Sequence, residues 1–554
     1  MALPPENRPA DLHRLTRGPL AVLGGGFAPG ALAGFQLAGL IFFLNPRLPF
    51  AFGPVLRGCL VYGALLGLAS LLLHLPFTWG RPRRARRVLP WSFTVALAAS
   101  ALLDWSHRYY YAFYLPPGIN DRLIKTALWL TLGTLIAFYT ALLHTLHRRR
   151  YGRRSRWGLT LVAALSVYAM VERREAFHPR PPAAPRPAAV EAGRRPKLWV
   201  IGIDSATLDA ILPLAGQGRL PFLATVLQNG AYGRLGTLIP TRRDAMWTTL
   251  ATGKYPFKHG INGRRSYPAD FIAPGAELRL LPTGLWFQRW GTLGARPLPP
   301  DIPAREALAL WEILPRLGVP AGVVGWPAAR PEAGEAAFDL PESFFSPPAS
   351  ARGPGASIDP LHADLWRQAV TLSLADRNPR VEAVFLLLPG LREVSHRWFG
   401  GFNAVQFEGE QSGGGGRAAA ERVAAYYARL DDLLEALWRR GEGPRLLAVV
   451  SAYGVASRGG SRVWGQVAPG AALGGEFQGG PDGALLLYGE GIRPGALLTG
   501  ARLVDVAPTL LYGLGFPVAR DLDGQVLTAA FDKSFLRRNP LSFFPSYEGL
   551  ARAR

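Results

Sequence analysis

Long apolar runs fill the first third of the chain, at about residues 18–44, 58–77, 88–103, 127–146 and 157–171. A helix needs ~20 apolar residues to cross ~30 Å of hydrocarbon, with ~17 as a lower limit. The first, second and fourth runs reach that length, and the third does so if Asp104 and Trp105 lie at the membrane interface. The pattern predicts an all-α transmembrane bundle of about five helices in residues 1–171. The fifth run is short, so it either spans the membrane or lies along its surface.

Short apolar runs alternating with helical patterns follow. Lys197–Asp204 is an apolar run that ends in an acid, and similar runs cover 322–325, 381–388, 446–451 and 483–487. Helical patterns lie between them, for example at 306–317, 361–374 and 418–440. This alternation predicts a doubly wound α/β domain in residues 197–532, with Asp204 at the carboxyl end of a strand, where such sheets place their sites. Residues 172–196, rich in Pro, Ala and Arg, are expected to form a stiff linker, and residues 533–554 a C-terminal tail.

The net charge of +23 is concentrated near the N-terminus. Residues 1–196 carry 25 Lys and Arg against 7 Asp and Glu, which leaves +18 there. The arginines gather in alternate loops, at 81–87 and 148–156, as the positive-inside bias predicts for cytoplasmic loops. We therefore expect a multi-pass protein of the plasma (inner) membrane, with a cytoplasmic N-terminus and, after five crossings, an extracytoplasmic C-terminal domain. If the fifth run is interfacial, that domain is cytoplasmic instead.

Composition narrows the class of partner. The sequence pI is about 10.7, but the basic residues flank apolar runs, so the expected partner is the lipid bilayer and not nucleic acid. Cys59 is the single cysteine, which excludes a disulfide scaffold. Aromatic residues at 109–114 are expected to form a belt at the outer membrane interface.

Several ordered motifs of the second half resemble one family. They are Val200-Ile-Gly-Ile-Asp204, the stretch from Trp247 to Ile261, Glu393-Val-Ser-His396, and the segment 505–524. Together they resemble the type I phosphodiesterase/nucleotide pyrophosphatase family of the alkaline phosphatase superfamily. The resemblance implies an alkaline-phosphatase-like fold in which two zinc ions flank a Ser or Thr nucleophile.

The metal-site positions that this resemblance implies are mostly changed. Asp204 and His396 keep residues of the metal-ligand type, but the nucleophile position is Arg243. The other expected ligand positions carry residues that do not suit zinc: Arg392, Ala452, Tyr453 and Gly479. Zinc normally takes three or four protein ligands, so two ligands divided between two metal positions would hold neither ion. Thr241, two residues before Arg243, could replace the nucleophile only by moving several ångströms.

The substitutions predict a pseudoenzyme with no catalytic residue, no cofactor, and Asp204 and His396 as vestigial metal ligands. Arg243 and Arg392 are candidates for binding an anion, since arginine recognises phosphate or carboxylate with a planar fork. The alternative is that each arginine pairs with Asp204 or Glu393 and fills an abandoned cavity. The expected role is a scaffold or anionic-ligand-binding subunit at the cell envelope, whose partner is an envelope protein complex or an anionic lipid or glycan. An active metal-dependent phosphodiesterase or phosphotransferase, acting on lipid head groups or envelope polymers through a rearranged site, is the alternative.

Overall fold

A computed structural model describes residues 12–78, 82–147, 151–171, 195–283, 305–327, 336–345, 359–408, 414–440, 443–457, 475–477 and 481–550. The chain divides into two compact units. One combines residues 1–178 with 264–301, and the other combines 179–263 with 302–554. The expected linker at 172–196 lies outside the described residues, apart from its last two positions.

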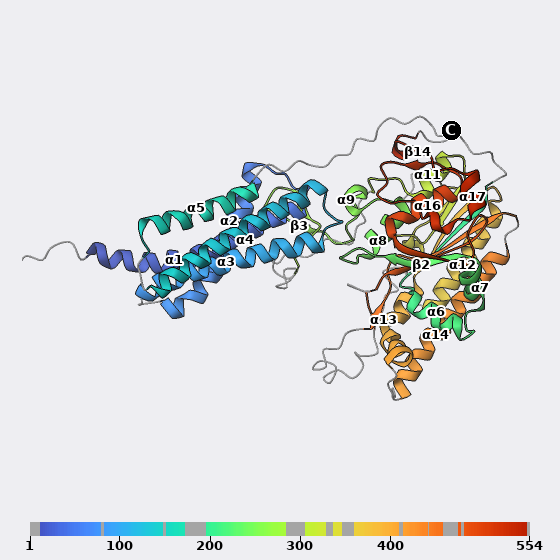
Figure 1. Ribbon diagram of the computed structural model, residues 1–554, viewed down its shortest axis with the longest axis horizontal. Coiled ribbons are helices and arrows are strands. Elements are labelled where there is room, and N and C mark those ends of the chain that lie inside the picture. The colour runs from blue at the N-terminus through green and yellow to red at the C-terminus, as the bar shows by residue number, and fades with distance from the viewer. Residues whose placement is uncertain are drawn as a thin grey trace, which may run out of the picture. The chain divides into compact units, whose positions relative to one another are not determined.

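The first unit is a bundle of five helices (Figure 1). They are α1 (Leu12–Leu44), α2 (Phe52–Thr78), α3 (Pro82–Tyr110), α4 (Pro117–Leu146) and α5 (Arg153–Val171). Helices α1 to α4 are long and apolar enough to cross a membrane. The 19 residues of α5 extend about 28 Å at 1.5 Å per residue, but α5 is not counted among the candidate spans. The predicted bundle of about five helices is therefore confirmed, and four of them have the composition of a membrane span.

The expected aromatic belt is only half correct. The side chain of Tyr109 is 74% exposed and Phe113 is also exposed, as an interfacial belt requires. Tyr111 and Tyr114, in contrast, are buried inside the unit. The Tyr111 hydroxyl donates a hydrogen bond to the carbonyl of Leu281, which explains why this ring turns inward.

A segment from the middle of the chain completes the helical unit. Residues 264–283 include the short strands β3 (Tyr267–Pro268) and β4 (Glu277–Leu278), which pair with each other. Their buried side chains form one cluster with residues of α1 and α2. The sequence pattern assigns these residues to the α/β domain, because the segment has no helical or strand period that sets it apart.

The second unit contains an eight-stranded mixed sheet in the order β12-β2-β11-β8-β1-β7-β5-β6. Its strands are β1 (Lys197–Ile203), β2 (Ala231–Gly236), β5 (Ala321–Val324), β6 (Phe338–Leu340), β7 (Ala383–Leu388), β8 (Arg445–Ser451), β11 (Gly483–Gly489) and β12 (Ala496–Arg502). Strand β11 runs antiparallel to both β2 and β8, whereas the other pairs are parallel. The sheet is alkaline-phosphatase-like, as predicted, although it is mixed and not wholly parallel.

Helices cover both faces of this sheet (Figure 1). One face shares a core with α6 (Leu208–Gly216), α7 (Pro221–Asn229), α13 (Gly390–Asn403) and α14 (Gly414–Arg439). On the other face, Trp247 of α8 (Arg243–Thr252) and Trp311 of α11 (Leu310–Arg316) pack around Trp326, and Phe385 of β7 joins them. The remaining helices of the unit are α9 (Pro256–His259), α12 (Pro360–Arg377), α16 (Val506–Gly513) and α17 (Lys533–Arg538), with one-turn helices η1 (Glu342–Phe345), η5 (Leu503–Asp505), η6 (Thr528–Ala530) and η7 (Tyr547–Gly549) and the π-helical turn η3 (Ala404–Glu408).

Residues expected to form a C-terminal tail pack on the α/β unit. Helix α17 and strand β14 (Phe543–Phe544) lie in this segment, and β14 pairs with β13 (Val518–Ala519). The other short strands, β9 (Ala456–Ser457) and β10 (Gly475–Glu476), pair with each other. Phe535 and Tyr547 are buried, so the segment up to residue 550 contributes to the core of the unit.

Candidate functional site

The site is built at the carboxyl end of β1, which lies between β7 and β8 in the sheet. Asp204 follows β1 directly and is fully buried. Its Oδ1 accepts hydrogen bonds from Trp247 Nε1 at 2.6 Å and from the Tyr453 hydroxyl at 2.9 Å. Its Oδ2 accepts from Arg243 Nε at 2.5 Å. Both carboxylate oxygens are therefore engaged by the protein itself.

Arg243 opens helix α8 and bridges two carboxylates. Besides Asp204, its guanidinium contacts Glu342 of η1, with Nη1 2.7 Å from Oε1. Burial alone would lower the pKa of Arg243, but the charges of Asp204 and Glu342 outweigh it and raise that pKa above its ordinary value. The third nitrogen, Nη2, is buried and has no hydrogen-bond partner in the described part of the chain. The structure therefore places Arg243 in an ion pair with Asp204, one of the two arrangements that the sequence left open.

A second buried arginine lies near this pair. Arg367 of α12 lies with its guanidinium 4.6 Å from the ring of Phe345. Burial lowers the pKa of Arg367, and the negative charges of Asp364 and Glu342 oppose that shift. The cluster therefore contains the guanidinium groups of Arg243 and Arg367 and the carboxyl groups of Asp204, Glu342 and Asp364. It has no surplus of positive charge.

Asp364 is, like Asp204, a fully buried acid of this cluster. It accepts hydrogen bonds from the backbone N–H of Gly390, at the start of α13, and from the Tyr426 hydroxyl at 2.8 Å. Burial raises the pKa of Asp364 to about 7, although Tyr426, Arg367 and the Gly390 amide lower it in part. The carboxyl group joins α12, α13 and α14 at the edge of the site.

The two remaining candidates, Arg392 and His396, lie together on the exposed face of α13. The guanidinium of Arg392 lies 5.0 Å from the centroid of the Phe477 ring, and the His396 ring stacks on the same ring at 6.0 Å. Phe477 in turn contacts Tyr453 edge-on at 6.0 Å. The Tyr453 hydroxyl reaches Asp204, so one aromatic pair separates the exposed α13 face from the buried ion pair. No carboxylate among the described residues forms a salt bridge with Arg392.

The residues present do not fit a zinc site. Both carboxylate oxygens of Asp204 already accept hydrogen bonds from the protein, and the Ala452 side chain offers no ligand atom. The pKa of Tyr453 is raised well above its ordinary value, first by burial and then by Asp204, so its hydroxyl stays protonated as a donor. Among the residues with described positions, no group of three or more His, Cys, Asp or Glu side chains could share a metal ion. Gly479, the position of the expected distal ligand, lies outside the described residues.

Thr241 is not a substitute nucleophile in this geometry. Its hydroxyl donates to the carbonyl of Leu238 at 3.3 Å. That bond belongs to the loop before α8 and leaves the hydroxyl in a structural role. The residue that occupies the nucleophile position, Arg243, carries no oxygen that could attack phosphorus.

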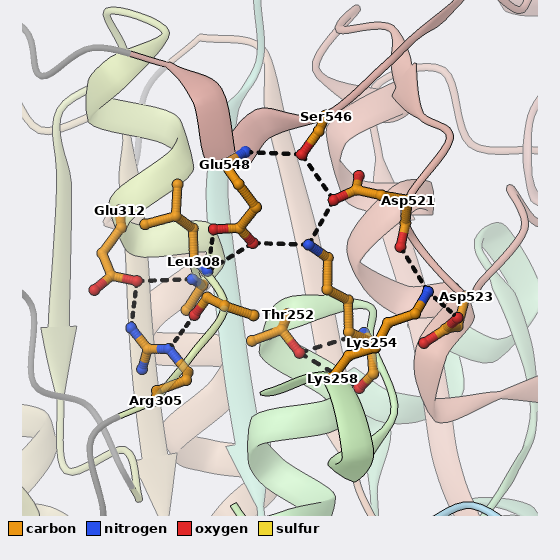
Figure 2. Close-up of polar contacts among 12 residues, drawn as sticks. Thr252, Lys254, Lys258, Arg305, Leu308, Glu312, Asp521, Asp523, Ser546 and Glu548 are labelled. Atoms are coloured by element: carbon orange, nitrogen blue, oxygen red, sulfur yellow. Dashed lines mark hydrogen bonds and ion pairs between the residues drawn. The ribbon is translucent and has the colours of Figure 1, made fainter. Parts of the chain in front are cut away.

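Motif residues after α8 form partly buried ion pairs (Figure 2). Figure 2 shows Lys254 Nζ between Asp521 at 2.6 Å and Glu548 at 2.7 Å. Lys258 Nζ pairs with Asp523 at 2.5 Å in the same view. These contacts connect the segment after α8 to the loop at 521–523 and to η7.

His259 is likewise structural. Its Nδ1 accepts from the backbone N–H of Ile261 at 3.1 Å, so Nε2 carries the proton and donates to the Thr249 hydroxyl at 2.9 Å. Burial lowers the pKa of His259 to about 3, which keeps the ring neutral.

The order of these elements and motifs agrees with a known family. Residues 198–464 match the type I phosphodiesterase / nucleotide pyrophosphatase family. The second unit, which contains most of the matched residues, is called the phosphodiesterase domain below after that model. The resemblance drawn from the motifs is thereby confirmed for the second half of the chain. No curated protein matches the chain.

Three solved structures are similar to this chain at low sequence identity and low TM-score. Murine ectonucleotide pyrophosphatase / phosphodiesterase 5, an inactive variant in complex with AMP, is 12% identical, with a TM-score of 0.39; the match covers 58% of this chain and 96% of that one. The human form is 11% identical, covering 59% and 97%, with a TM-score of 0.38. A phosphonate monoester hydrolase from Silicibacter pomeroyi is 12% identical, covering 61% and 78%, with a TM-score of 0.38.

Glu342 and Arg367 are site residues that sequence reasoning missed. Glu342 lies in a one-turn helix about 100 residues after Arg243, and no motif surrounds it. Its one signal is that an acid follows the short edge strand β6. Arg367 lies in the interior of α12, where a sequence pattern alone gives no reason to expect a buried charge.

Proposed function

We propose that this chain is a membrane-anchored pseudoenzyme of the type I phosphodiesterase family, which acts as a scaffold or ligand-binding subunit at the cell envelope. The observation that carries the proposal is the Asp204–Arg243 ion pair. Arginine at the nucleophile position cannot form a bond to phosphorus, and its permanent charge opposes a metal ion at the same carboxylate. Trp247 and Tyr453 engage the other carboxylate oxygen.

Two observations support an extracytoplasmic phosphodiesterase domain. The arginine-rich segments 81–87 and 148–156 follow α2 and α4 and include the first residues of α3 and α5, on the side that the positive-inside bias assigns to the cytoplasm. Residues 264–283 bind near the other helix ends, through Asn45 just after α1 and His107 near the end of α3. Residues 148–156 lie at the proposed cytoplasmic side of the bundle, and residues 264–283 lie at the opposite side. On this proposal α5 carries the chain from one side to the other, and its length of about 28 Å nearly matches ~30 Å of hydrocarbon.

The exposed face around Arg392 is the better candidate for an anionic ligand. Arg243 is already neutralised by Asp204 and Glu342, whereas Arg392 is exposed beside Phe477 and His396. A guanidinium over an aromatic ring can still donate a planar fork to a phosphate or carboxylate. We therefore assign an anionic lipid head group or glycan to this face.

Metal analysis combined with a hydrolysis assay tests the pseudoenzyme proposal. The full chain in detergent would be incubated with zinc or manganese, washed, and assayed for bound metal and for hydrolysis of bis(p-nitrophenyl) phosphate. We expect substoichiometric metal and no turnover, with the Asp204→Ala variant indistinguishable from the parent in both respects. Stoichiometric metal together with hydrolysis that is lost in Asp204→Ala would establish the active-enzyme alternative.

Thermal unfolding tests the ligand face separately. Phosphatidylglycerol and inorganic phosphate serve as probes, because binding to the folded state raises its stability. We expect stabilisation by one of them that is reduced in Arg392→Gln. Arg397→Gln is the matched control, since Arg397 is also exposed on α13 and lies over the ring of Trp398. Equal responses in the two variants would remove the assignment to Arg392.

A further inference from the structure

Four helices of the first unit share an apolar cluster in the interior of the bundle. Leu97 and Ala101 of α3 are buried in it together with Leu32 of α1 and Leu130 of α4, and Val162 of α5 packs against them. Successive helices are joined by short connections, so α1, α3 and α5 run in one direction and α4 in the other (Figure 1). The cluster therefore identifies, for each of these four helices, the face that points into the bundle.

About one turn from this cluster, each of the four helices carries a buried polar side chain. Positions three or four apart on a helix share a face and differ in depth by about 5–6 Å. The polar residues are Gln36 (four after Leu32), Asp104 (three after Ala101), Thr126 (four before Leu130) and Ser166 (four after Val162). Each of them is at most 2% exposed. We call these four residues the polar layer.

The polar layer contains buried atoms without hydrogen-bond partners. Among the described residues, neither the oxygen nor the nitrogen of the Gln36 amide has a partner, and Asp104 Oδ2 has none. The hydroxyl groups of Thr126 and Ser166 donate to carbonyls of their own helices, at 2.9 and 2.8 Å, so their oxygen lone pairs remain open as acceptors. Buried polar groups in proteins are nearly always paired, and most of the open capacity in this layer belongs to oxygen acceptors.

Asp104 is the one ionisable residue of the polar layer, and its own helix does not neutralise it. It lies within the candidate span Val88–Tyr110, where an unpaired carboxylate is costly. Arg108, one turn further along α3, is partly exposed, and no salt bridge joins it to Asp104 in the part of the chain that the structure describes. His107 donates from Nδ1 to the Leu103 carbonyl and accepts at Nε2 from Thr283 N–H, so its ring is neutral.

The neighbouring helices bring no buried cation to Asp104 either. Residues 22–44 of α1 and 157–171 of α5 contain no Asp, Glu, Lys, Arg or His. On α2, Arg57 is exposed, and on α4, Lys125 is exposed and Arg122 is partly exposed. A buried carboxylate needs a compensating positive charge, so the ligand that matches this layer is a cation. One carboxylate balances one positive charge, which favours a monovalent cation over a divalent one.

We propose that the polar layer binds one monovalent cation, a proton or a sodium ion, inside the helical unit. A proton on Asp104 converts the carboxylate into a donor that suits the Gln36 amide oxygen. A sodium ion takes carboxylate, amide and hydroxyl oxygens, which are the ligands that hard cations prefer. The helical unit then has a binding function of its own besides anchoring the chain. This inference concerns the helical unit alone and does not rest on the proposed function.

Two measurements on the full chain in lipid nanodiscs distinguish the two cations. Scintillation proximity measures binding of radioactive sodium, and infrared spectroscopy at neutral pH, taken as the difference from Asp104→Asn, detects the carbonyl band of a protonated Asp104. We expect either one saturable sodium ion per chain, lost in Asp104→Asn, or no bound sodium and a protonated carboxyl band in the difference spectrum. Asp121→Asn is the matched control, because Asp121 is an exposed acid of the same unit, and it should retain whichever signal the unchanged chain gives.

A second variant tests whether the polar layer acts as one site. Gln36→Leu removes one oxygen ligand, so it should weaken sodium binding about tenfold or shift the pH at which the carboxyl band disappears by about one unit. Unchanged values in Gln36→Leu would overturn the proposal, since Gln36 would then not share the site.

Two results for Asp104 would also overturn it. Sodium binding that persists in Asp104→Asn would place the cation elsewhere in the chain. An ionised Asp104 without bound sodium would mean that Arg108 or solvent balances its charge. If Asp104→Asn does not fold, the amount of sodium bound by the unchanged chain and the response of Gln36→Leu still decide the question.

Discussion

Replacing Arg243 by methionine should be among the most destabilising single changes in the phosphodiesterase domain. The Arg243 side chain is 16% exposed and Asp204 is fully buried, so water cannot replace the lost cation at Asp204. Two neutral donors, Trp247 and Tyr453, would remain on the carboxylate. Removing one partner of a buried ion pair typically costs ~3–5 kcal/mol. Glu342 contributes less to this penalty, because it is 22% exposed and can turn toward solvent.

Thermal unfolding of the full chain in detergent measures this cost. A domain of this size shifts its midpoint by roughly 2 °C per kcal/mol, so a loss of roughly 6–10 °C is expected for Arg243→Met. The control is Arg219→Met, because Arg219 pairs with Glu421 at the surface, where a salt bridge contributes ~1 kcal/mol or less. Asp204→Asn combined with Arg243→Met should cost less than the sum of the single changes, by ~2 kcal/mol. If Arg243→Met unfolds no earlier than Arg219→Met, the pair does not stabilise the site.

Three further outcomes are expected. Burial raises the pKa of Asp364 to about 7, against ~3.9 in an unfolded chain, so the contribution of Asp364 to stability is complete below about pH 4 and is lost as the pH rises through 7. Asp364→Asn should therefore flatten the pH dependence of the unfolding free energy between about pH 4 and 7, and an unchanged slope would contradict this prediction. Lys254→Met should destabilise the domain by ~2 kcal/mol in denaturant unfolding, because Asp521 and Glu548 lose their shared cation. An unchanged free energy of unfolding would mean that water solvates the two carboxylates as well as Lys254 does. In spheroplasts of a Cys59→Ser background, an impermeant maleimide should label Ser534→Cys and not Gly152→Cys, whereas protection of both cysteines until the cells are lysed would place the domain in the cytoplasm.

The sequence predicts those parts of the fold in which many consecutive residues are apolar because they share one apolar environment. The strand before Asp204 and the long helices α1 to α4 belong to this group. The direction of β11 was not predictable, because a strand buried on both faces has the same sequence pattern in either direction. The docking of residues 264–283 also left no periodic signal, since its polar bonds run from side chains such as Asn45 to the backbone. Backbone bonds of this kind depend little on the sequence of the segment that is held.

The sequence identifies which residues occupy the site positions, but it does not show which side chains they contact. Counting back from Trp247 along a recognisable motif identifies Arg243, and the strand pattern identifies Asp204. Their contact follows from the topology, because α8 begins next to the carboxyl end of β1. Glu342 comes from a distant edge of the sheet, and its pairing with Arg243 depends on tertiary packing that no local pattern encodes.

The ion pair supplies at Asp204 the positive charge that the pseudoenzyme proposal removes with the metal. A fully buried carboxylate needs a cation or several donors, and Arg243 provides the cation from the helix that would otherwise carry the nucleophile. On the pseudoenzyme proposal, the loss of the nucleophile and the loss of the metal are one coupled change, because the same side chain replaces both. It follows that Arg243→Thr, which restores a hydroxyl at this position, should not restore an enzyme. It would remove the cation from Asp204 while Arg392, Ala452 and Tyr453 still offer no metal ligand, so the expected product is a less stable and equally inactive protein.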